Sequence, residues 1–134
     1  ALENQVTAKN AERVKAGCVL EIANGPVDSK ADAILGNRGV PVLPDVLVNA
    51  GGVTVSYFEW VQNRAGLYWE EPEVNDRLRK RMDAEADEVF ALAERDEISL
   101  RTAAYVHGVG RIVGAISEQG TQEYFQNDGA RSSA

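Results

Sequence analysis

Residues 17–44 of this chain, GCVLEIANGPVDSKADAILGNRGVPVLP, decide its fold. Residues 17–23 are largely apolar without clean alternation, which is typical of a strand buried on both faces in a parallel sheet. Residues 40–44 form a second short apolar run, and Asp28 or Ser29 can cap a helix between the two runs. The order strand, helix, strand predicts a parallel crossover unit.

The flanking segments divide the chain into three parts. Thr7 can cap a short helix to about residue 15, which makes residues 1–44 an α/β crossover unit. Residues 45–117 are helical in pattern, and residues 118–134, rich in Gly, Ser, Asn and Gln, are expected to be a loose tail. We therefore expect an α/β fold: a partial Rossmann-like parallel sheet with two identifiable strands, followed by long C-terminal helices.

The helical part begins with a helix from Asp45 to about residue 64. A long helix follows, opened by Pro72, and Ser99 can cap a final helix to about residue 117. The long helix has an apolar stripe that is predicted to face the core: Val74, Leu78, Met82, Val89 and Phe90. It also has a basic cluster flanked by acids, which is predicted to be a solvated helix face: Arg77, Arg79, Lys80 and Arg81.

Two strands are too few for a free-standing parallel sheet, because such sheets normally have several strands with both faces covered. We therefore expect the sheet to be completed by further residues or by another chain. The chain opens on Ala1, and on this interpretation it is part of a longer protein.

The composition is that of one globular domain of cytosolic type, and we expect a cytoplasmic protein. The 134 residues carry 21 acidic and 14 basic side chains, a balance that argues against a nucleic-acid partner. No apolar run reaches the roughly 18 residues that a membrane helix needs. Cys18 is the only cysteine, which excludes an internal disulfide and a cysteine metal cage, and its apolar surroundings predict a buried side chain.

Amide side chains follow both predicted strands. Asn24 comes directly after the first, and Asn49 lies five residues past Pro44. Because ligands bind beyond the carboxyl ends of parallel strands, the two carboxamides should face the same edge of the sheet. Carboxamides suit the ribose hydroxyls or the amide group of a dinucleotide cofactor. The alternative for Asn24 is that it caps a turn with Gly25-Pro26.

The block Asn49-Ala-Gly-Gly-Val-Thr-Val-Ser-Tyr-Phe-Glu-Trp-Val-Gln-Asn63 places an amide and a glycine pair at the start of an apolar helix. Gly51 and Gly52 permit unusual dihedrals and close approach of a ligand, or they merely kink the helix. Val53 and Ser56 fall three apart on one helical face, so an apolar contact and a hydroxyl point the same way. Such a pair can hold a short acid by its methylenes and its far carboxylate.

The remaining polar motifs indicate structure rather than chemistry. His107, the only histidine, lies in an apolar helix and is predicted to be structural. The sequence Gly108-Val-Gly110 lies within the same predicted helix without a preceding strand, so it is not a dinucleotide fingerprint. The usual serine-nucleophile, zinc-protease and P-loop signatures are absent from the sequence.

A family resemblance runs from residue 1 to about 117. Four stretches carry it: Ala1-Leu-Glu-Asn-Gln-Val-Thr7, Glu21-Ile-Ala-Asn-Gly-Pro26, Pro44-Asp-Val-Leu-Val-Asn-Ala-Gly-Gly-Val-Thr-Val-Ser-Tyr-Phe-Glu-Trp-Val-Gln-Asn63 and Arg101-Thr-Ala-Ala-Tyr105. In order and spacing they resemble the C-terminal part of the coenzyme-binding domain of a hexameric-type glutamate dehydrogenase. Related leucine and phenylalanine dehydrogenases usually lack the serine at position 56, so Ser56 favours glutamate.

The resemblance implies oxidative deamination of L-glutamate to 2-oxoglutarate and ammonia, with NAD or NADP as cofactor, in a homo-hexamer. It implies that Asn24 lies by the nicotinamide ribose and Asn49 by the nicotinamide amide. It also implies that Ser56 hydrogen-bonds the side-chain carboxylate of glutamate, with Val53 packed beside it.

The catalytic Lys and Asp of that family, and its G-x-G-x-x-G loop, lie upstream of a segment like this one and are not in these 134 residues. The chain is therefore expected to supply one wall of a cleft and no catalytic residue, and the 134 residues alone are expected not to oxidise glutamate. The alternative is a catalytically inactive truncated or stand-alone packing module of the same fold. The sequence does not decide between NAD and NADP. The residue that reads the ribose phosphate belongs to the first crossover unit of such a domain, which is not in these residues.

Overall fold

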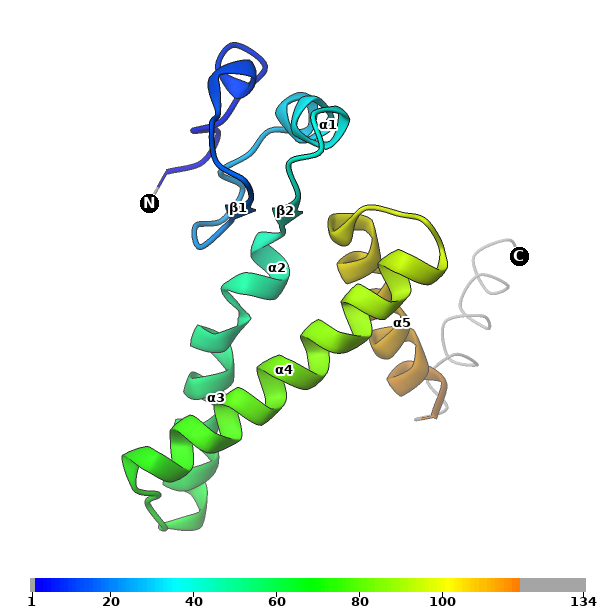
Figure 1. Cartoon of the computed structure of the whole chain (residues 1–134). Helices are drawn as coiled ribbons and strands as arrows, with labels where there is room; N and C mark the ends of the chain where they lie inside the picture. Colours follow the sequence, from blue (N-terminus) through cyan, green and yellow to red (C-terminus); the bar gives the residue numbers. More distant parts are fainter. Residues whose placement is uncertain (1, 119–134) are drawn as a thin grey trace, which may run out of the picture.

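The computed structural model describes residues 2–118 of the chain. A short α/β part comes first, and the helices α2 to α5 follow it in chain order (Figure 1). This confirms the expected fold class, α/β with two parallel strands followed by long helices. Of the predicted loose tail, residue 118 ends the last helix, and residues 119–134 lie outside the described part of the chain.

The sheet is the parallel crossover that the sequence predicts. Strand β1 (Val19–Leu20) pairs in parallel with β2 (Val42–Leu43), and helix α1 (Ser29–Asn37) connects them. Val19 lies beside Val42 in the register of this pair. Both strands are shorter than the apolar runs that predicted them, so the two strands pair over a short length only.

Local capping signals set the ends of α1. The Asp28 carboxylate accepts the N–H of Ala31 (2.6 Å), which satisfies one of the free donors of the first turn. Gly39 follows the helix with φ +70°, a conformation that side chains with a Cβ rarely adopt. Of the two caps that the sequence offers, Asp28 and Ser29, the structure uses Asp28.

The predicted helix from Thr7 to residue 15 is wrong. The segment forms only one 3₁₀ turn, η1 (Ala11–Arg13). The Asn10 side chain accepts the backbone N–H of Thr7 (2.7 Å) and donates to the carbonyl of Gln5 (2.9 Å). These bonds fix the chain at residues 5–10, and the extended backbone of Val14 ends η1 after three residues.

A first core lies between α1 and the sheet and consists of Ala11, Val27, Ala31, Leu35 and Val40. Val19 packs against it, whereas the next residue, Leu20, points to the other side and is 54% exposed. Ile22 is 76% exposed and Cys18 is also exposed. The predictions of a strand buried on both faces and of a buried Cys18 are therefore wrong for this chain, because no described element covers the second side of β1.

The helical part has one more break than the sequence predicts. The first predicted helix divides at Asn49 into α2 (Asp45–Val48) and α3 (Ala50–Ala65). Helix α4 (Glu71–Arg95) opens with Pro72 as expected. Helix α5 (Leu100–Glu118) begins where the Ser99 hydroxyl accepts the N–H of Thr102 (3.1 Å), so the predicted cap is confirmed.

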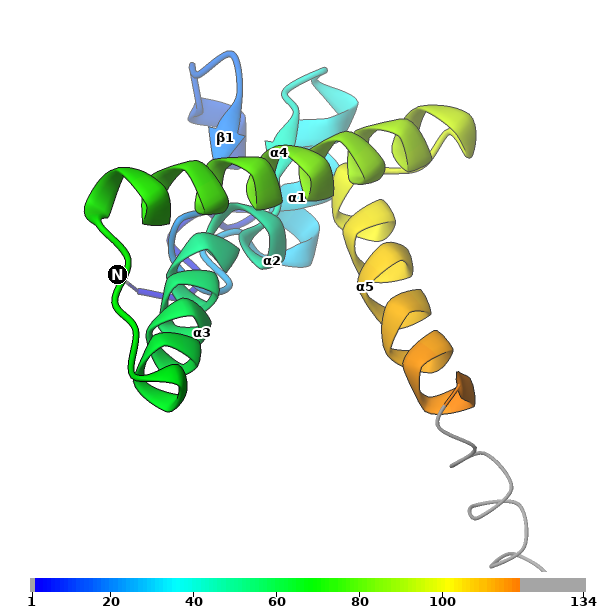
Figure 2. The same cartoon turned by 90° about the horizontal axis from the view of Figure 1, so that it is seen from below.

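Helix α4 crosses both α3 and α5, as the two perpendicular views show (Figures 1 and 2). A second core joins α2, α4 and α5 and consists of Leu47, Val89, Ala103 and Ala104. Of the predicted apolar stripe, Val89 is 2% exposed and Val74, Leu78 and Met82 are half-buried, but Phe90 is 46% exposed. Successive residues point about 100° apart on a helix, so Val89 and Phe90 cannot both face α5.

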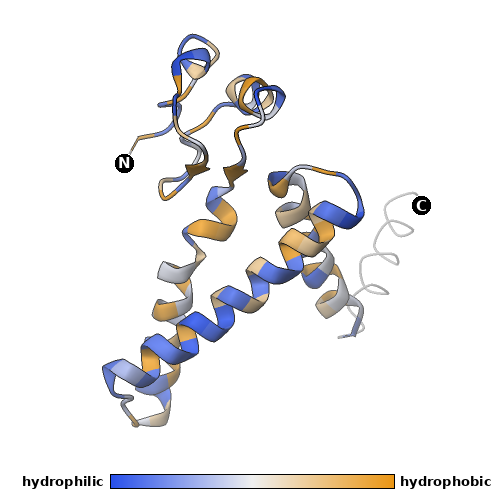
Figure 3. Cartoon of the chain, in the orientation of Figure 1, coloured by the Kyte–Doolittle hydropathy of each residue, from blue (hydrophilic) through white to orange (hydrophobic). Residues whose placement is uncertain are grey.

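The outer face of α4 is hydrophilic, in contrast to the hydrophobic strands (Figure 3). Arg77 pairs with Glu73 (2.9 Å) and Lys80 with Asp76 (2.7 Å), each one helical turn apart. The prediction that the basic cluster is a solvated helix face is confirmed. Within residues 2–118, none of the helices combines the length and the apolar character needed to span a bilayer.

Candidate functional site

Asn24 and Asn49 meet at the carboxyl edge of the sheet. Asn24 lies in the loop after β1, and Asn49 stands at the break between α2 and α3. The Nδ2 of Asn49 donates to the Oδ1 of Asn24 (2.7 Å), so the prediction that both carboxamides face one edge is confirmed. The turn at Gly25 (φ +55°) is held instead by its own N–H, which donates to the carboxylate of Asp45 (2.8 Å).

The pair borders an open hollow of about 560 Å³. Its other lining residues are Glu3, Ile22 and Ala23. Among the described residues, neither the Nδ2 of Asn24 nor the Oδ1 of Asn49 has a hydrogen-bond partner, so the pair keeps one donor group and one acceptor for a ligand. A ligand with an amide and a hydroxyl group matches this set.

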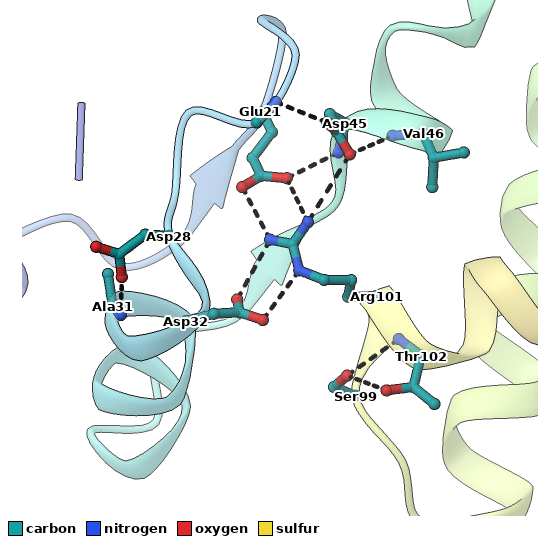
Figure 4. A network of polar contacts seen from close by, with 10 residues as sticks. Glu21, Asp28, Ala31, Asp32, Asp45, Val46, Ser99, Arg101 and Thr102 are labelled. Atoms are coloured by element: carbon teal, nitrogen blue, oxygen red, sulfur yellow. Dashed lines mark hydrogen bonds and ion pairs between the residues drawn. The ribbon is translucent and has the colours of Figure 1, made fainter. Parts of the chain in front are cut away.

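An ion cluster of Glu21, Asp32, Asp45 and Arg101 lies at the ends of the two strands (Figure 4). The two terminal nitrogens of Arg101 donate to the carboxylate of Glu21 (2.9 and 2.8 Å), and its Nε donates to Asp32 (2.9 Å). Asp45 lies 3.8 Å from the same guanidinium, and its N–H donates to Glu21 (2.9 Å). One arginine of α5 thus contacts carboxylates from β1's end, α1 and α2.

Because Glu21 is buried, its charge depends on the hydrogen bonds and the positive charge that Arg101 supplies. Glu21 is fully buried, and a buried carboxylate is costly unless charge partners and hydrogen bonds compensate it. The hydrogen bonds to Glu21 raise the pKa of Arg101 above its ordinary value; burial opposes this rise, and the bond to Asp32 adds to it. Arg101 is therefore a permanent cation in the folded chain.

The sequence analysis did not identify this cluster. Glu21 and Arg101 are 80 positions apart in the sequence, so no local pattern joins them. One signal was available: Glu21 is a carboxylate inside the apolar run of residues 17–23. Acidic residues are almost never fully buried without a partner, so a carboxylate at this position predicts a basic partner elsewhere in the chain.

Val53 and Ser56 lie on α3, beyond the Asn pair. Val53 is 71% exposed, and the exposed Ser56 donates its hydroxyl to the carbonyl of Gly52 (3.1 Å) within the helix. Asn49, Val53 and Ser56 are spaced four and three residues apart, which puts them on one helical face. An amide, an apolar side chain and a hydroxyl therefore follow one another along this face.

The glycine pair keeps ordinary helical geometry. Gly51 and Gly52 lie in the first turn of α3, and neither has a positive φ. A Cβ at Gly51 would reach ordinary contact with Leu78 (3.8 Å) and Met82 (3.9 Å), whereas one at Gly52 would meet nothing within 4 Å. The pair does not adopt the unusual dihedrals that glycine permits, but space for close approach of a ligand remains at Gly52.

His107 takes part in a structural contact, as the sequence predicts. Its Nε2 lies 2.7 Å from the carboxylate of Glu85, which also pairs with Arg111 and with Arg81 (3.3 Å). This contact joins α4 to α5. No group of three or more His, Cys, Asp or Glu side chains within residues 2–118 is arranged to hold a metal ion.

Amide, apolar and hydroxyl side chains gathered beyond the carboxyl ends of parallel strands define the class: an α/β protein with a candidate small-molecule site at its sheet edge. The particular family follows from comparison. The chain belongs to the Glutamate/Leucine/Phenylalanine/Valine dehydrogenase family, which it matches over residues 1–120. This confirms the resemblance found in the sequence.

Two curated relatives differ in cofactor. The chain is 53% identical over 127 residues to the NADP-specific glutamate dehydrogenase of Synechocystis sp., a match that covers 95% of this chain and 30% of that protein. It is 48% identical over 120 residues to the NAD-specific glutamate dehydrogenase of Staphylococcus aureus, covering 90% of this chain and 29% of that protein. The chain thus spans about 30% of the length of the relatives that it matches.

Solved structures agree with this assignment. The crystal structure of glutamate dehydrogenase from Peptoniphilus asaccharolyticus superposes with a TM-score of 0.84 at 42% identity, over 90% of this chain and 30% of that one. The hetero-hexameric glutamate dehydrogenase from Thermus thermophilus, in its leucine-bound form, gives 0.83 at 33% identity, over 87% and 28%.

Proposed function

We propose that this chain forms one wall of the active-site cleft of a glutamate dehydrogenase. The reaction is oxidative deamination of L-glutamate to 2-oxoglutarate and ammonia, with NAD or NADP as cofactor. The observation that carries the proposal is the Asn24–Asn49 pair beside its hollow, in a chain of this dehydrogenase family. Relatives of both cofactor specificities support a nicotinamide cofactor without choosing between the two.

A nicotinamide cofactor fits the free groups of the Asn pair. The Oδ1 of Asn49 is an acceptor that suits the amide NH₂ of nicotinamide, and the Nδ2 of Asn24 is a donor that suits a ribose hydroxyl. Bound there, the cofactor supplies the acceptor for the hydride of the substrate. The role of this chain is to bind and orient the nicotinamide end.

We propose that glutamate lies along the face of α3 that begins at Asn49. Its methylenes would contact Val53, and its far carboxylate would accept the hydroxyl of Ser56. The exposure of both side chains and their spacing along one helical face support this placement. We assign no catalytic acid or base to this chain, so those groups come from the rest of the protein.

We also propose a homo-hexamer for the full-length protein. The hetero-hexameric Thermus thermophilus enzyme, whose fold this chain shares, supports an assembly of six subunits, and the identity of the six is part of the proposal. Light scattering of the purified full-length protein measures the assembly directly. A monomer or dimer at assay concentration would contradict this part of the proposal.

The test of function is an assay of the full-length protein that contains this chain. With glutamate and either NAD or NADP, we expect the absorbance of the reduced cofactor to appear. Leucine and phenylalanine serve as alternative substrates within the family, and we expect them to be used far less efficiently. Preference for an apolar amino acid, or no oxidation of any of the three, would overturn the proposal.

A further inference from the structure

The ion cluster of Glu21, Asp32, Asp45 and Arg101 is hydrogen-bonded to the backbone of both segments that carry the site's carboxamides. On one side, Asn24 is followed by Gly25, whose N–H donates to the Asp45 carboxylate (2.8 Å). On the other side, the N–H of Asn49 donates to the Asp45 carbonyl (2.9 Å). Asp45 therefore holds the loop that carries Asn24 through its carboxylate and begins α2, the helix whose C-cap is Asn49.

Arg101 fixes Asp45 and Glu21 relative to each other. Its guanidinium binds Glu21 through two nitrogens and lies 3.8 Å from Asp45, while Glu21 accepts the N–H of Asp45 (2.9 Å). Glu21 is 0% exposed, Asp45 18% and Asp32 23%. With the cation removed, three carboxylates would face one another in a largely buried space, and their repulsion would push these segments apart.

We infer that Arg101 is a positioning residue for the cofactor side of the site, acting through Glu21 and Asp45 to fix the distance between the Asn24 and Asn49 carboxamides. This inference rests on the proposed function. Arg101 itself touches neither the hollow nor Val53 and Ser56, so it acts only through its partners. Because it belongs to α5, it also ties the last described helix to the sheet edge where the cofactor is proposed to bind.

The geometry requires an arginine. The planar guanidinium presents parallel donors to the Glu21 carboxylate and a further donor to Asp32, an arrangement that one ammonium cannot reproduce. Arg101→Lys therefore keeps the charge but loses the two-point contact. Arg101→Met keeps the volume of the stem and loses the charge.

The experiment is a double-mutant cycle in the full-length protein. Arg101→Met and Arg101→Lys are each combined with Asn49→Ala, and the dissociation constant of the reduced cofactor, its KM and the melting temperature are measured. In Arg101→Met we expect cofactor affinity to fall on the order of tenfold or more, with partial recovery in Arg101→Lys. In the Asn49→Ala background we expect Arg101→Met to change cofactor affinity little, because the pair that it positions is already lost.

Arg111→Met is the matched control, because Arg111 lies on the same helix but pairs with Glu85 of α4 and not with Glu21, Asp32 or Asp45. We expect it to lower the melting temperature and leave cofactor affinity unchanged. The inference is overturned if Arg101→Met and Arg101→Lys alter only the melting temperature, or if their effects on cofactor affinity persist undiminished in the Asn49→Ala background. If Arg101→Met does not fold, the Arg101→Lys cycle decides alone.

Failure of the proposed function gives a different result. A wild-type protein that binds the reduced cofactor but does not oxidise glutamate contradicts the proposed reaction, while the binding cycle still measures the coupling between Arg101 and Asn49. A glutamate-active wild type with additive effects in the cycle contradicts only the role of Arg101.

Discussion

Ser56 shows how one hydroxyl can serve both the helix and a ligand. Its bond to the Gly52 carbonyl satisfies the hydroxyl while the side chain stays exposed to solvent. A carbonyl that is already part of a helix has little need of this extra donor, so the hydroxyl can turn to a carboxylate that arrives beside Val53. A charged acceptor makes the stronger bond of the two.

We therefore expect Ser56→Val in the full-length protein to lower kcat/KM for glutamate. The loss should correspond to about 1.5 to 3 kcal/mol of transition-state stabilisation. Efficiency with leucine should change much less, since leucine has no side-chain carboxylate. Thr54→Val is the matched control, because Thr54 makes the same kind of bond to the carbonyl of Ala50 (2.9 Å). Equal losses for glutamate and leucine would contradict the role of Ser56.

Single residues were predictable from the sequence where a local rule fixed them. Asn24 and Asn49 could be placed at one edge because each follows a strand of the same parallel pair. Arg101 could not be placed, because its partners come from positions 21, 32 and 45 and only the tertiary fold joins them. The charge of Glu21 within an apolar run was the one trace of the cluster in the sequence.

At the scale of elements, helix starts were predicted better than strands. Asp28, Pro72 and Ser99 each mark a helix start by a capping rule that acts within one turn. The burial of β1 was predicted wrongly because burial depends on which elements cover a strand, and the described residues cover only one side. The helix expected after Thr7 is reduced to the single turn η1, because the backbone is already extended at Val14.

Helix α1 offers a test of capping. We expect Asp28→Ala to lower the free energy of unfolding of the full-length protein by about 1 kcal/mol, because the N–H of Ala31 loses its acceptor. Chemical denaturation, followed by fluorescence, measures the change. Lys30→Ala, on the exposed side of the same turn, should stay within about 0.5 kcal/mol of the wild type. Equal effects for the two variants would mean that the cap adds no stability.

The contact between α4 and α5 depends on pH through Glu85. The hydrogen bond from Arg111 is the main cause that lowers the pKa of Glu85; burial opposes it, and the bond from His107 adds to it. A carboxyl whose folded pKa is lowered contributes stability above its ordinary pKa of 4.5 and loses it as the pH falls below that value. This contact should therefore weaken in acid.

We expect Glu85→Gln to lower the free energy of unfolding at neutral pH by about 1 kcal/mol or less, since two of the three partners are half exposed. The difference from the wild type should shrink as the pH falls toward about 4. Denaturation curves across this range measure it, with Glu88→Gln as the control on the exposed side of α4. A difference that stays constant with pH would contradict the role of the ionised Glu85.

At the scale of the whole molecule, the described residues leave much apolar surface uncovered. Ile22, Val109 and Ile112 are 76%, 54% and 62% exposed, on the sheet edge and on α5. Apolar side chains gathered on open faces mark contact surfaces. The two cores are small, and each covers one side of the elements that build it. These exposed apolar faces are suited to contacts with other parts of the protein or with another chain.

In the proposed function the Asn pair, Val53 and Ser56 likewise form one side of a site, and no general acid or base is assigned to the open hollow beside the Asn pair. We therefore expect the 134 residues alone, purified and mixed with glutamate and NAD or NADP, to produce no reduced cofactor. The full-length protein, assayed at the same molar concentration, is the control and should be active. Positioning of two reacting groups accounts for many orders of magnitude in rate, so a chain that supplies only one of the two walls should fall below detection. Reduced cofactor formed by the 134 residues would show that they carry a catalytic acid or base of their own.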